Sequence, residues 1–396
     1  MKRLRKSITP IIHKSTNAHT MGAKGDGTTD DLAAITALLG FNAVYFPSGT
    51  YRLTNKIILN NKSVLNISGD GNTVSIIKSD IATSLQFQYV TSDINISDIH
   101  FTTDLNNTAN TNPLIFLNNI QSTNITFTRC RFSCPTTGGN AIAIWLFDYI
   151  SSGVKFINCI FENIGRMGIE ILNRLNINPL TTDAYTNYSI TGCTFNNIGL
   201  AGLYGMGVSF SGKGSYCNIS NNTFNNMLSI GIEGGFNNTL VDNNTFTGFT
   251  HSYESISCTT SVNTCAANVY TNNIDNNSGT ANRWNFWALT GAIIRGNTLA
   301  NGKMYFRDSS NATIDSNTIT NNVDQTLYFE GASTNNNIIN NHLDNIATSS
   351  AFNVWYYNTG ANNNSLNNNT FKCALGKAWR QTSGSTGNTE ANSTYL

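Results

Sequence analysis

Two glutamates in the middle of the chain have the residue type and the spacing that acid–base chemistry requires. Glu170 and Glu233 each follow a Gly-Ile pair, and Ser209 occupies the matching position between them. If the three lie on successive turns of a repeating structure, the carboxyl groups are roughly 9.6 Å apart, at about 4.8 Å per turn. Glycoside hydrolysis with inversion uses one protonated and one ionised carboxyl group, about 6.5–9.5 Å apart. We therefore predict that Glu170 and Glu233 are a catalytic pair, the alternative being hydrated surface glutamates.

Aromatic residues recur at the same position of other turns and could bind a sugar. Trp and Tyr rings offer flat apolar faces to the C–H groups of a pyranose, and polar side chains bind its hydroxyl groups. The alternative is that loops or a neighbouring subunit cover the rings, because bare aromatic side chains on a sheet are costly. The predicted substrate-binding residues are Trp145, Ser209, Trp287, Tyr305, Arg307, Tyr328, Glu330 and Trp355, with Asn285 and Tyr357 on the same stripe.

Other chemistries have weaker support. Glu254 is a third carboxylate, but Ile256 would turn it inward if the two residues share a face. A lyase or epimerase acting on a uronate needs a base and a group that neutralises the carboxylate, commonly Ca²⁺ or clustered Lys and Arg. The stripe offers only Arg307 and the nearby Lys303, so we predict no metal and no cofactor. The remaining candidates are Asp148, Asp308 and the lone histidines His251 and His342.

A sequence repeat supplies the elements that would place these residues side by side. Each copy has a hydrophobic residue, a Cys or Asn three positions later, and a second hydrophobic residue two positions after that, as in 127–132. Copies recur roughly every 20 to 34 residues, a spacing typical of solenoids. We predict that three short strands form each turn and that the Cys or Asn position stacks inside. These positions are Cys130, Cys159, Cys193, Asn222, Asn244, Asn272, Asn297, Asn317, Asn341 and Asn369.

The composition limits the partners. Charged residues make up 11% of the 396-residue chain, against roughly 25% in ordinary soluble domains. Lys+Arg 23 and Asp+Glu 22 leave a net charge of +1, which offers no field for nucleic acid and suits a neutral partner such as a sugar. No long apolar run follows the basic N-terminus or occurs later, so we expect neither a Sec signal nor membrane insertion. A disulfide between Cys258 and Cys265 stays open.

The two ends of the chain differ from the repeat. Residues 1–20 are predicted to be a flexible basic segment and residues 21–60 a cap. In the cap, Leu32, Ile35, Leu38 and Leu39 predict a short amphipathic helix, and a strand, a Pro/Gly turn and a strand at 43–54 predict a hairpin. The solenoid is predicted at 61–373, followed by a loose low-complexity tail at 374–396.

The cap also carries a family resemblance. Gly-Ala-Lys-Gly-Asp-Gly-Thr-Thr-Asp-Asp at 22–31 and Val-Tyr-Phe-Pro-Ser-Gly-Thr-Tyr at 44–51 resemble the opening motif of the pectate-lyase-like superfamily, and most closely that of phage tailspike depolymerases. The resemblance implies an all-β fold, a single-stranded right-handed parallel β-helix (solenoid) with a short N-terminal capping α-helix. It also implies that Asp26, Asp30 and Asp31 hold the cap together and are not catalytic.

The resemblance further implies a function. We expect a polysaccharide depolymerase, similar to a glycoside hydrolase, that binds and cleaves a bacterial surface glycan (a capsule, an O-antigen or similar) along one face of the β-helix. A polysaccharide lyase or uronate epimerase is the alternative within this fold, and a non-catalytic glycan-binding or structural protein is the alternative of another class. The resemblance favours a homotrimer and a place in the phage virion tail, or else secretion by a route without a Sec signal.

Overall fold

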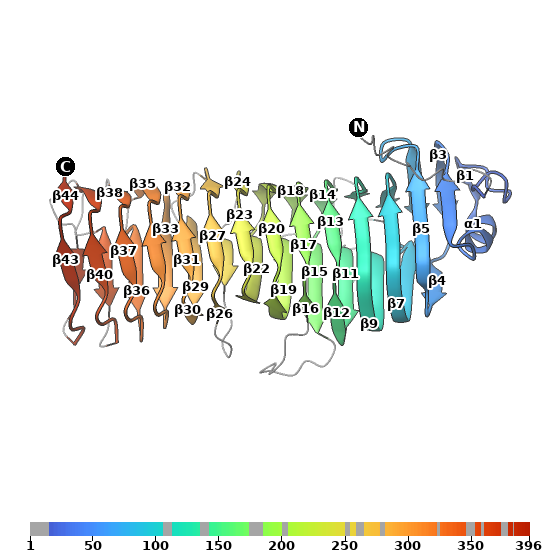
Figure 1. The fold of residues 1–396 in the computed structure, drawn as a ribbon. Coiled ribbons are helices and arrows are strands. Elements are labelled where there is room, and N and C mark those ends of the chain that lie inside the picture. Colours follow the sequence, from blue (N-terminus) through green and yellow to red (C-terminus); the bar gives the residue numbers. More distant parts are fainter. Residues whose placement is uncertain are drawn as a thin grey trace, which may run out of the picture.

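The computed structural model of the chain is an elongated stack of strands, with the helix at one end and the C-terminal strands at the other (Figure 1). The structure describes residues 16–105, 113–134, 142–173, 185–199, 205–249, 254–258, 265–277, 282–322, 325–345, 353–357, 360–373, 379–382 and 384–396. Strands of successive turns pair in parallel throughout these ranges, so the predicted parallel β-solenoid is confirmed.

One face is a 15-stranded sheet, called here the back sheet. Its strands are β1 (Asp26–Asp30), β3 (Gly49–Leu53), β6 (Ser75–Ser79), β8 (His100–Thr103), β10 (Arg131–Ser133), β14 (Ile160–Ile164), β18 (Thr194–Ile198), β21 (Thr223–Met227), β24 (Thr245–Thr247), β28 (Ile274–Asp275), β32 (Thr298–Ala300), β35 (Thr318–Asn322), β38 (His342–Asn345), β41 (Thr370–Cys373) and β44 (Thr394–Tyr395).

A second face, called here the front sheet, carries the candidate site. Its strands are β4 (Ile57–Asn60), β7 (Leu85–Ser97), β9 (Pro113–Thr128), β11 (Ile142–Asp148), β15 (Met167–Asn173), β19 (Met206–Ser215), β22 (Ile230–Asn237), β25 (Glu254–Cys258), β29 (Asn282–Trp287), β33 (Gly302–Arg307), β36 (Leu327–Glu330), β39 (Val354–Tyr357) and β42 (Trp379–Gln381).

The later residues of β7, β9 and β19 pass into the third face. This face contains β2 (Ala43–Phe46), β5 (Ser63–Gly69), β12 (Ile150–Ser152), β13 (Lys155–Ile157), β16 (Tyr185–Thr186), β17 (Ser189–Thr191), β20 (Asn218–Ser220), β23 (Leu240–Asp242), β27 (Val269–Thr271), β31 (Ile293–Arg295), β34 (Thr313–Asp315), β37 (Asn337–Ile339), β40 (Ser365–Asn367) and β43 (Thr389–Ala391). Strands β26 (Cys265–Ala266) and β30 (Leu289–Thr290) form a separate pair.

Aromatic rings from successive turns stack inside the solenoid. The second hydrophobic residue of the repeat faces the core from the back sheet, because side chains alternate along a strand. Neighbouring ring centroids are 4.7–5.6 Å apart and nearly parallel. The stack consists of Phe101, Phe132, Phe161, Phe195, Phe224 and Phe246.

A ladder of buried amides runs beside this stack, as the repeat predicts. In Asn297, for example, the side-chain oxygen accepts hydrogen bonds from the backbone and side-chain nitrogens of Asn273, at 2.9 and 3.0 Å. Its own Nδ2 donates to the Asn317 Oδ1 and to the carbonyl of Tyr270. Each amide therefore links three turns. The amide ladder comprises Asn222, Asn244, Asn273, Asn297, Asn317, Asn341 and Asn369, and Cys193 precedes it.

One predicted member of the ladder is wrong. Asn273, not Asn272, lies in the amide ladder, because Tyr270 and not Val269 is the inward residue of that turn. Asn272 instead takes the left-handed backbone conformation, with φ 53°. The shift brings a carboxyl group into the core: Asp275 pairs with Phe246, is fully buried, and accepts a 2.9 Å hydrogen bond from the Trp284 indole.

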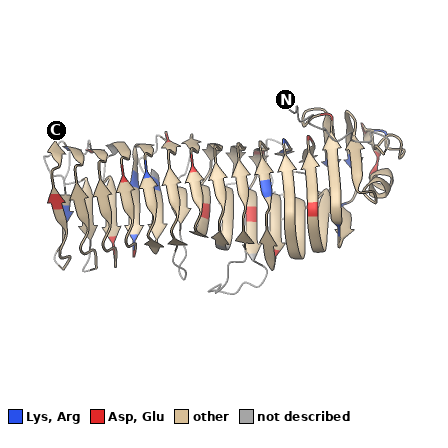
Figure 2. Ribbon diagram, in the orientation of Figure 1, with Lys and Arg blue, Asp and Glu red and all other residues tan. Residues whose placement is uncertain are grey.

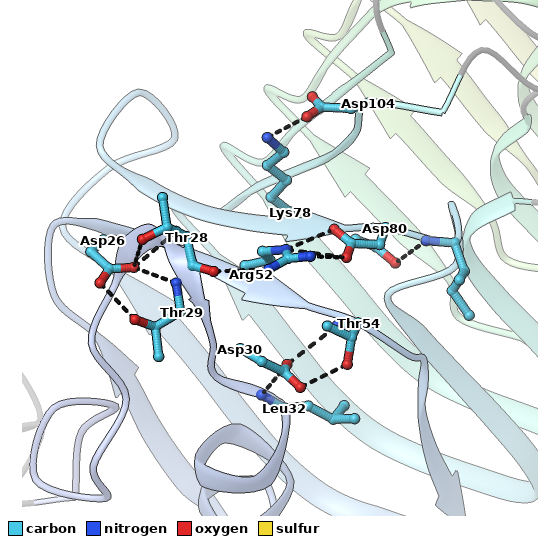
Figure 3. Close-up of polar contacts among 12 residues, drawn as sticks. Asp26, Thr28, Thr29, Asp30, Leu32, Arg52, Thr54, Lys78, Asp80 and Asp104 are labelled. Carbon is cyan, nitrogen blue, oxygen red and sulfur yellow. Dashed lines mark hydrogen bonds and ion pairs between the residues drawn. The ribbon is translucent and has the colours of Figure 1, made fainter.

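The cap contains the predicted helix, α1 (Leu32–Leu38), with Ile35 and Leu38 buried. The acidic residues of the opening motif bind backbone groups (Figure 3): Asp26 accepts from the amides of Thr28 and Thr29, and Asp30 from the amide of Leu32. These hydrogen bonds lower the pKa of Asp26 well below its usual range. Asp31 accepts from the amides of Lys24 and Gly25. The acidic residues of the motif therefore stabilise the backbone of the cap.

The predicted hairpin is wrong. Strands β2 and β3 do not pair with each other; β2 pairs in parallel with β5, and β3 with β1 and β6. The Pro/Gly turn changes the face of the solenoid rather than the direction of the chain. The solenoid hydrogen bonds therefore begin within 21–60.

The predicted loose tail is also wrong where the structure describes it. Strands β42, β43 and β44 continue the three faces by pairing with β39, β40 and β41. Low sequence complexity did not prevent this pairing. The side chain of Asn388 accepts a 2.9 Å hydrogen bond from the side chain of Asn364, which itself accepts one from Asn336. Cys258 and Cys265 form a disulfide.

The amide ladder predicts a stability effect. Asn297→Ala removes the acceptor of the buried backbone N–H of Asn273 and the side-chain donor to the carbonyl of Tyr270, each loss costing about 1–3 kcal/mol. We expect a loss of at least about 2 kcal/mol in the free energy of unfolding, measured by urea titration. The matched control is Asn337→Ala, an exposed residue of β37, which should change stability by less than about 0.5 kcal/mol. Equal effects of the two substitutions would contradict a role for the ladder.

Candidate functional site

The front sheet brings the predicted residues into line. Pairing between successive strands places Trp145 beside Glu170, then Ser209 and Glu233. The line continues through Ser257, Asn285, Tyr305, Tyr328 and Trp355, and is called here the outer ladder. A parallel second ladder, two residues further along each strand, contains Trp287, Arg307, Glu330 and Tyr357. All ten predicted site residues therefore lie on one face.

Glu170 and Glu233 lie two rungs apart in the outer ladder, with Ser209 between them. Glu170 is only 5% exposed, and its Oε2 has no hydrogen-bond partner. Its other oxygen lies 3.7 Å from Nη2 of Arg166. Glu233 accepts a 2.9 Å hydrogen bond from the Ser209 hydroxyl. The two carboxyl groups are thus held differently.

The surroundings raise the pKa values of both Glu170 and Glu233. Burial raises the pKa of Glu170 above its usual 4.5, the Arg166 charge opposes this, and the charge of Glu233 adds to it. Burial likewise raises the pKa of Glu233, which the Ser209 hydrogen bond opposes and the charge of Glu254 increases. Low solvation and like charges favour the protonated form of a carboxyl group. Both carboxyl groups therefore keep a proton to higher pH than an ordinary glutamate does.

The glycines before these glutamates make room for core side chains rather than for a ligand. A Cβ on Gly207 would lie 2.6 Å from the Phe224 ring and 2.7 Å from the carbonyl oxygen of Gly231. Gly168 and Gly231 are in the same position against Phe195 and Phe246. Beside the outer ladder lies an apolar strip against which Trp145 packs, composed of Ile142, Met167, Met206 and Ile230.

Glu254 belongs to this face, which settles its orientation. Ile256 is fully buried, whereas Glu254 follows Ile230 in the neighbouring apolar strip. Its Oε1 binds Nη2 of Arg283 at 2.9 Å and accepts from Nδ2 of Asn285 at 2.8 Å. Arg283 was not among the residues predicted for the site. Arg283 precedes Trp284 and occupies the position that Lys303 takes in the next turn. This matching position was the signal that could have identified it as a site residue.

The aromatic end of the outer ladder forms a groove of about 350 Å³. Tyr305 and Tyr328 stack on each other at 5.2 Å, so the faces between them are closed to a ligand and their edges are presented. Trp355 meets Tyr328 edge to face, and the Tyr305 hydroxyl donates to Glu330. This corrects the expectation of separate flat platforms.

The other aromatic residues also have protein partners. Trp145 stacks on Phe116 at 4.9 Å, and the Arg307 guanidinium lies 4.9 Å from the centre of the Trp287 ring. Arg307 also lies 3.7 Å from Asp308. The polar rungs from Glu170 to Asn285 separate Trp145 from the groove.

The weaker candidates lie away from the pair. Asp148 is fully buried and accepts from the backbone of Asn119, and His342 lies on the back sheet. His251 lies outside the described residues. Within the described ranges, no group of three or more His, Cys, Asp or Glu could hold a metal ion. The described part of the chain likewise has no helix long and apolar enough to cross a membrane.

Charged residues are sparse along the solenoid (Figure 2). The middle of the front sheet is an exception, since Glu170 and Glu233 in the outer ladder and Glu254 in the neighbouring strip lie within a few turns of one another. With few distant charges present, local contacts dominate the proton affinity of these groups.

Comparison with solved structures shows the same fold in proteins of different kinds. Tailspike protein 3 of bacteriophage CBA120 is 12% identical with a TM-score of 0.63, over 95% of this chain and 61% of that one. The catalytic unit of a GH87 α-1,3-glucanase from Streptomyces thermodiastaticus is 13% identical (TM-score 0.53; 94% and 68%). PfbA, a surface adhesin of Streptococcus pneumoniae, is 20% identical (TM-score 0.51; 96% and 90%).

The sequence itself matches a family. No curated protein matches the chain. The profile described as rhamnogalacturonase A/epimerase, pectate lyase-like, matches residues 15–282, which include the cap, Glu170 and Glu233. The chain therefore belongs to the rhamnogalacturonase A/epimerase family of pectate lyase-like β-helix proteins.

Proposed function

We propose that the protein is a polysaccharide depolymerase that hydrolyses glycosidic bonds at Glu170 and Glu233. The observation that carries the proposal is the alignment of two carboxyl groups of raised pKa, two rungs apart, on the line that leads into an aromatic groove. An extended glycan lying along the outer ladder would contact both. The glucanase and tailspike similarities support a carbohydrate-active fold but are too distant to indicate the reaction.

The two glutamates take different roles. Glu170 is the general acid, because its buried Oε2 without a partner favours the protonated form. Glu233 is the general base, because the Ser209 hydroxyl donates to its carboxylate and stabilises the charged form. Glu233 takes a proton from water as the water attacks the anomeric carbon, and Glu170 protonates the leaving oxygen. Two rungs, roughly 9.6 Å, leave room for this water and indicate inversion.

A glycan-binding protein without turnover is the second candidate. The observation that favours it is the low exposure of Glu170, which restricts the approach of a substrate to the acid. In this case the groove between Tyr305 and Trp355 would hold the glycan, and the glutamates would have no chemical role.

Replacement of each glutamate tests the proposal. Glu170→Gln and Glu233→Gln keep the shape but remove proton transfer, which contributes about 10²–10⁴-fold to rate. We expect such a loss of reducing-end release from a panel of capsular and O-antigen polysaccharides, with glycan binding retained. Glu390→Gln, in β43, is the control and should leave turnover unchanged. Unchanged turnover in both glutamate variants would contradict the assignment. Ultraviolet absorbance of an unsaturated product would indicate a lyase.

The pH profile is a further prediction. Activity should fall as the pH drops through the pKa of Glu233, the base, and as the pH rises through the pKa of Glu170, the acid. Both limbs should lie above 4.5, because both pKa values are raised. Glu254→Gln removes a charge that raises the pKa of Glu233 and should move the acidic limb of kcat/KM to lower pH. A limb unmoved in this variant would show that Glu233 is not the base.

A further inference from the structure

The aromatic groove has a chemical asymmetry that the glutamate pair does not use. Its floor is made of Tyr305, Tyr328 and Trp355. Arg283 and Lys303, which pair in register on neighbouring strands, lie along one border. Glu330, two residues beyond Tyr328, lies along the other. A ligand that fills the groove therefore meets cations on one edge and a carboxylate on the other.

We infer that this groove is a subsite for an anionic sugar unit, whose carboxylate or sulfate group binds Arg283 and Lys303 and whose hydroxyl groups bind Glu330 and Tyr305. The inference rests on the proposed function, since it treats the front sheet as the glycan-binding face. A pyranose ring fits such a groove because it can carry an anionic group on one edge and a diol on the other.

The cationic border has donors for an anion. Arg283 binds Glu254 through Nε and Nη2, and Nη1 takes no part in that contact. The Arg283 guanidinium is also held 5.7 Å from the centre of the Tyr305 ring, so its position is fixed before a ligand arrives. A preoriented guanidinium binds carboxylate or sulfate oxygens with two parallel donors, whereas Lys303 supplies a point charge.

The neighbouring rung adds unsatisfied polar atoms. Asn285 is 2% exposed, and its Oδ1 has no hydrogen-bond partner. The indole nitrogen of Trp287, on the same strand, is likewise without one. Buried polar atoms without partners are rare and costly, which is typical of positions completed by a ligand or water. Asn285 lies one rung from Tyr305, on the side of the subsite toward Glu233.

The subsite is remote from the proposed cleavage point. Three rungs of the outer ladder separate Glu233 from Tyr305, which is roughly 14 Å at about 4.8 Å per rung. Several sugar units of an extended glycan span this distance. The groove would therefore hold a sugar that is not cleaved, and a substrate too short to reach it would lose this binding energy.

Calorimetric titration of the Glu170→Gln/Glu233→Gln protein tests the subsite without turnover. The probes are hexamers of polygalacturonate, the same hexamers with reduced carboxyl groups, and hexamers of κ-carrageenan, which carry sulfate but no carboxylate. We expect at least one anionic probe to bind, and the neutral hexamer to bind at least tenfold more weakly. Lys303→Met should weaken that anionic binding at least tenfold. The matched control is Lys372→Met, which removes a cation from the back sheet and should have no effect.

The outcomes separate the two proposals. The subsite would be overturned if neither anionic probe bound, or if the neutral hexamer bound equally well. It would also be overturned if Lys303→Met left both the affinity and the unfolding midpoint unchanged. None of these results depends on turnover, so the acid–base assignment would stand. Anionic binding that depends on Lys303, combined with full turnover in the single glutamate variants, would support the subsite and reject the catalytic pair.

Discussion

Hydrogen bonds between stacked asparagine amides fix the register of one turn on the next. Each buried amide of the ladder binds the turn before it and the turn after it, and the bonds are 2.8–3.0 Å long from Asn222 to Asn341. A slip by one residue would leave all these buried groups without partners and would turn every outward side chain inward. The ladder and the backbone pairing therefore enforce the same alignment.

This alignment turns distant sequence positions into a site. Glu170, Ser209 and Glu233 come from three different turns and are separated by different numbers of residues, yet they occupy consecutive rungs. The repeat tolerates turns of different length, because additional residues lie between the strands and the strands keep their register. The resulting surface repeats along one axis, as the units of a linear polymer do.

The charged groups of the front sheet change from one end of the sheet to the other. Burial and neighbouring carboxylates raise the proton affinity of Glu170 and Glu233, whereas the Arg166 charge opposes this at Glu170 and the Ser209 hydrogen bond opposes it at Glu233. Beyond Asn285 the face becomes cationic on one edge, and Arg283 connects the two regions through its ion pair with Glu254. This ion pair therefore lies between the carboxylate-rich part of the face and its cationic edge.

The sequence by itself determined the solenoid, the short helix, all but one of the stacked Cys and Asn positions, and the shared face of the ten predicted site residues. These follow from local alternation and from the repeat, which are readable without knowing any contact between turns. Only the tertiary structure decided that β2 and β3 pair in parallel with other turns, that Asn273 replaces Asn272, and that Gly207 makes room for Phe224. The burial of Glu170, the stacking of Tyr305 on Tyr328 and the Arg283–Glu254 ion pair also depend on it. The physical reason is that these properties arise between turns, where side-chain packing and the register of each strand, rather than the order of residues along it, set distance and solvation.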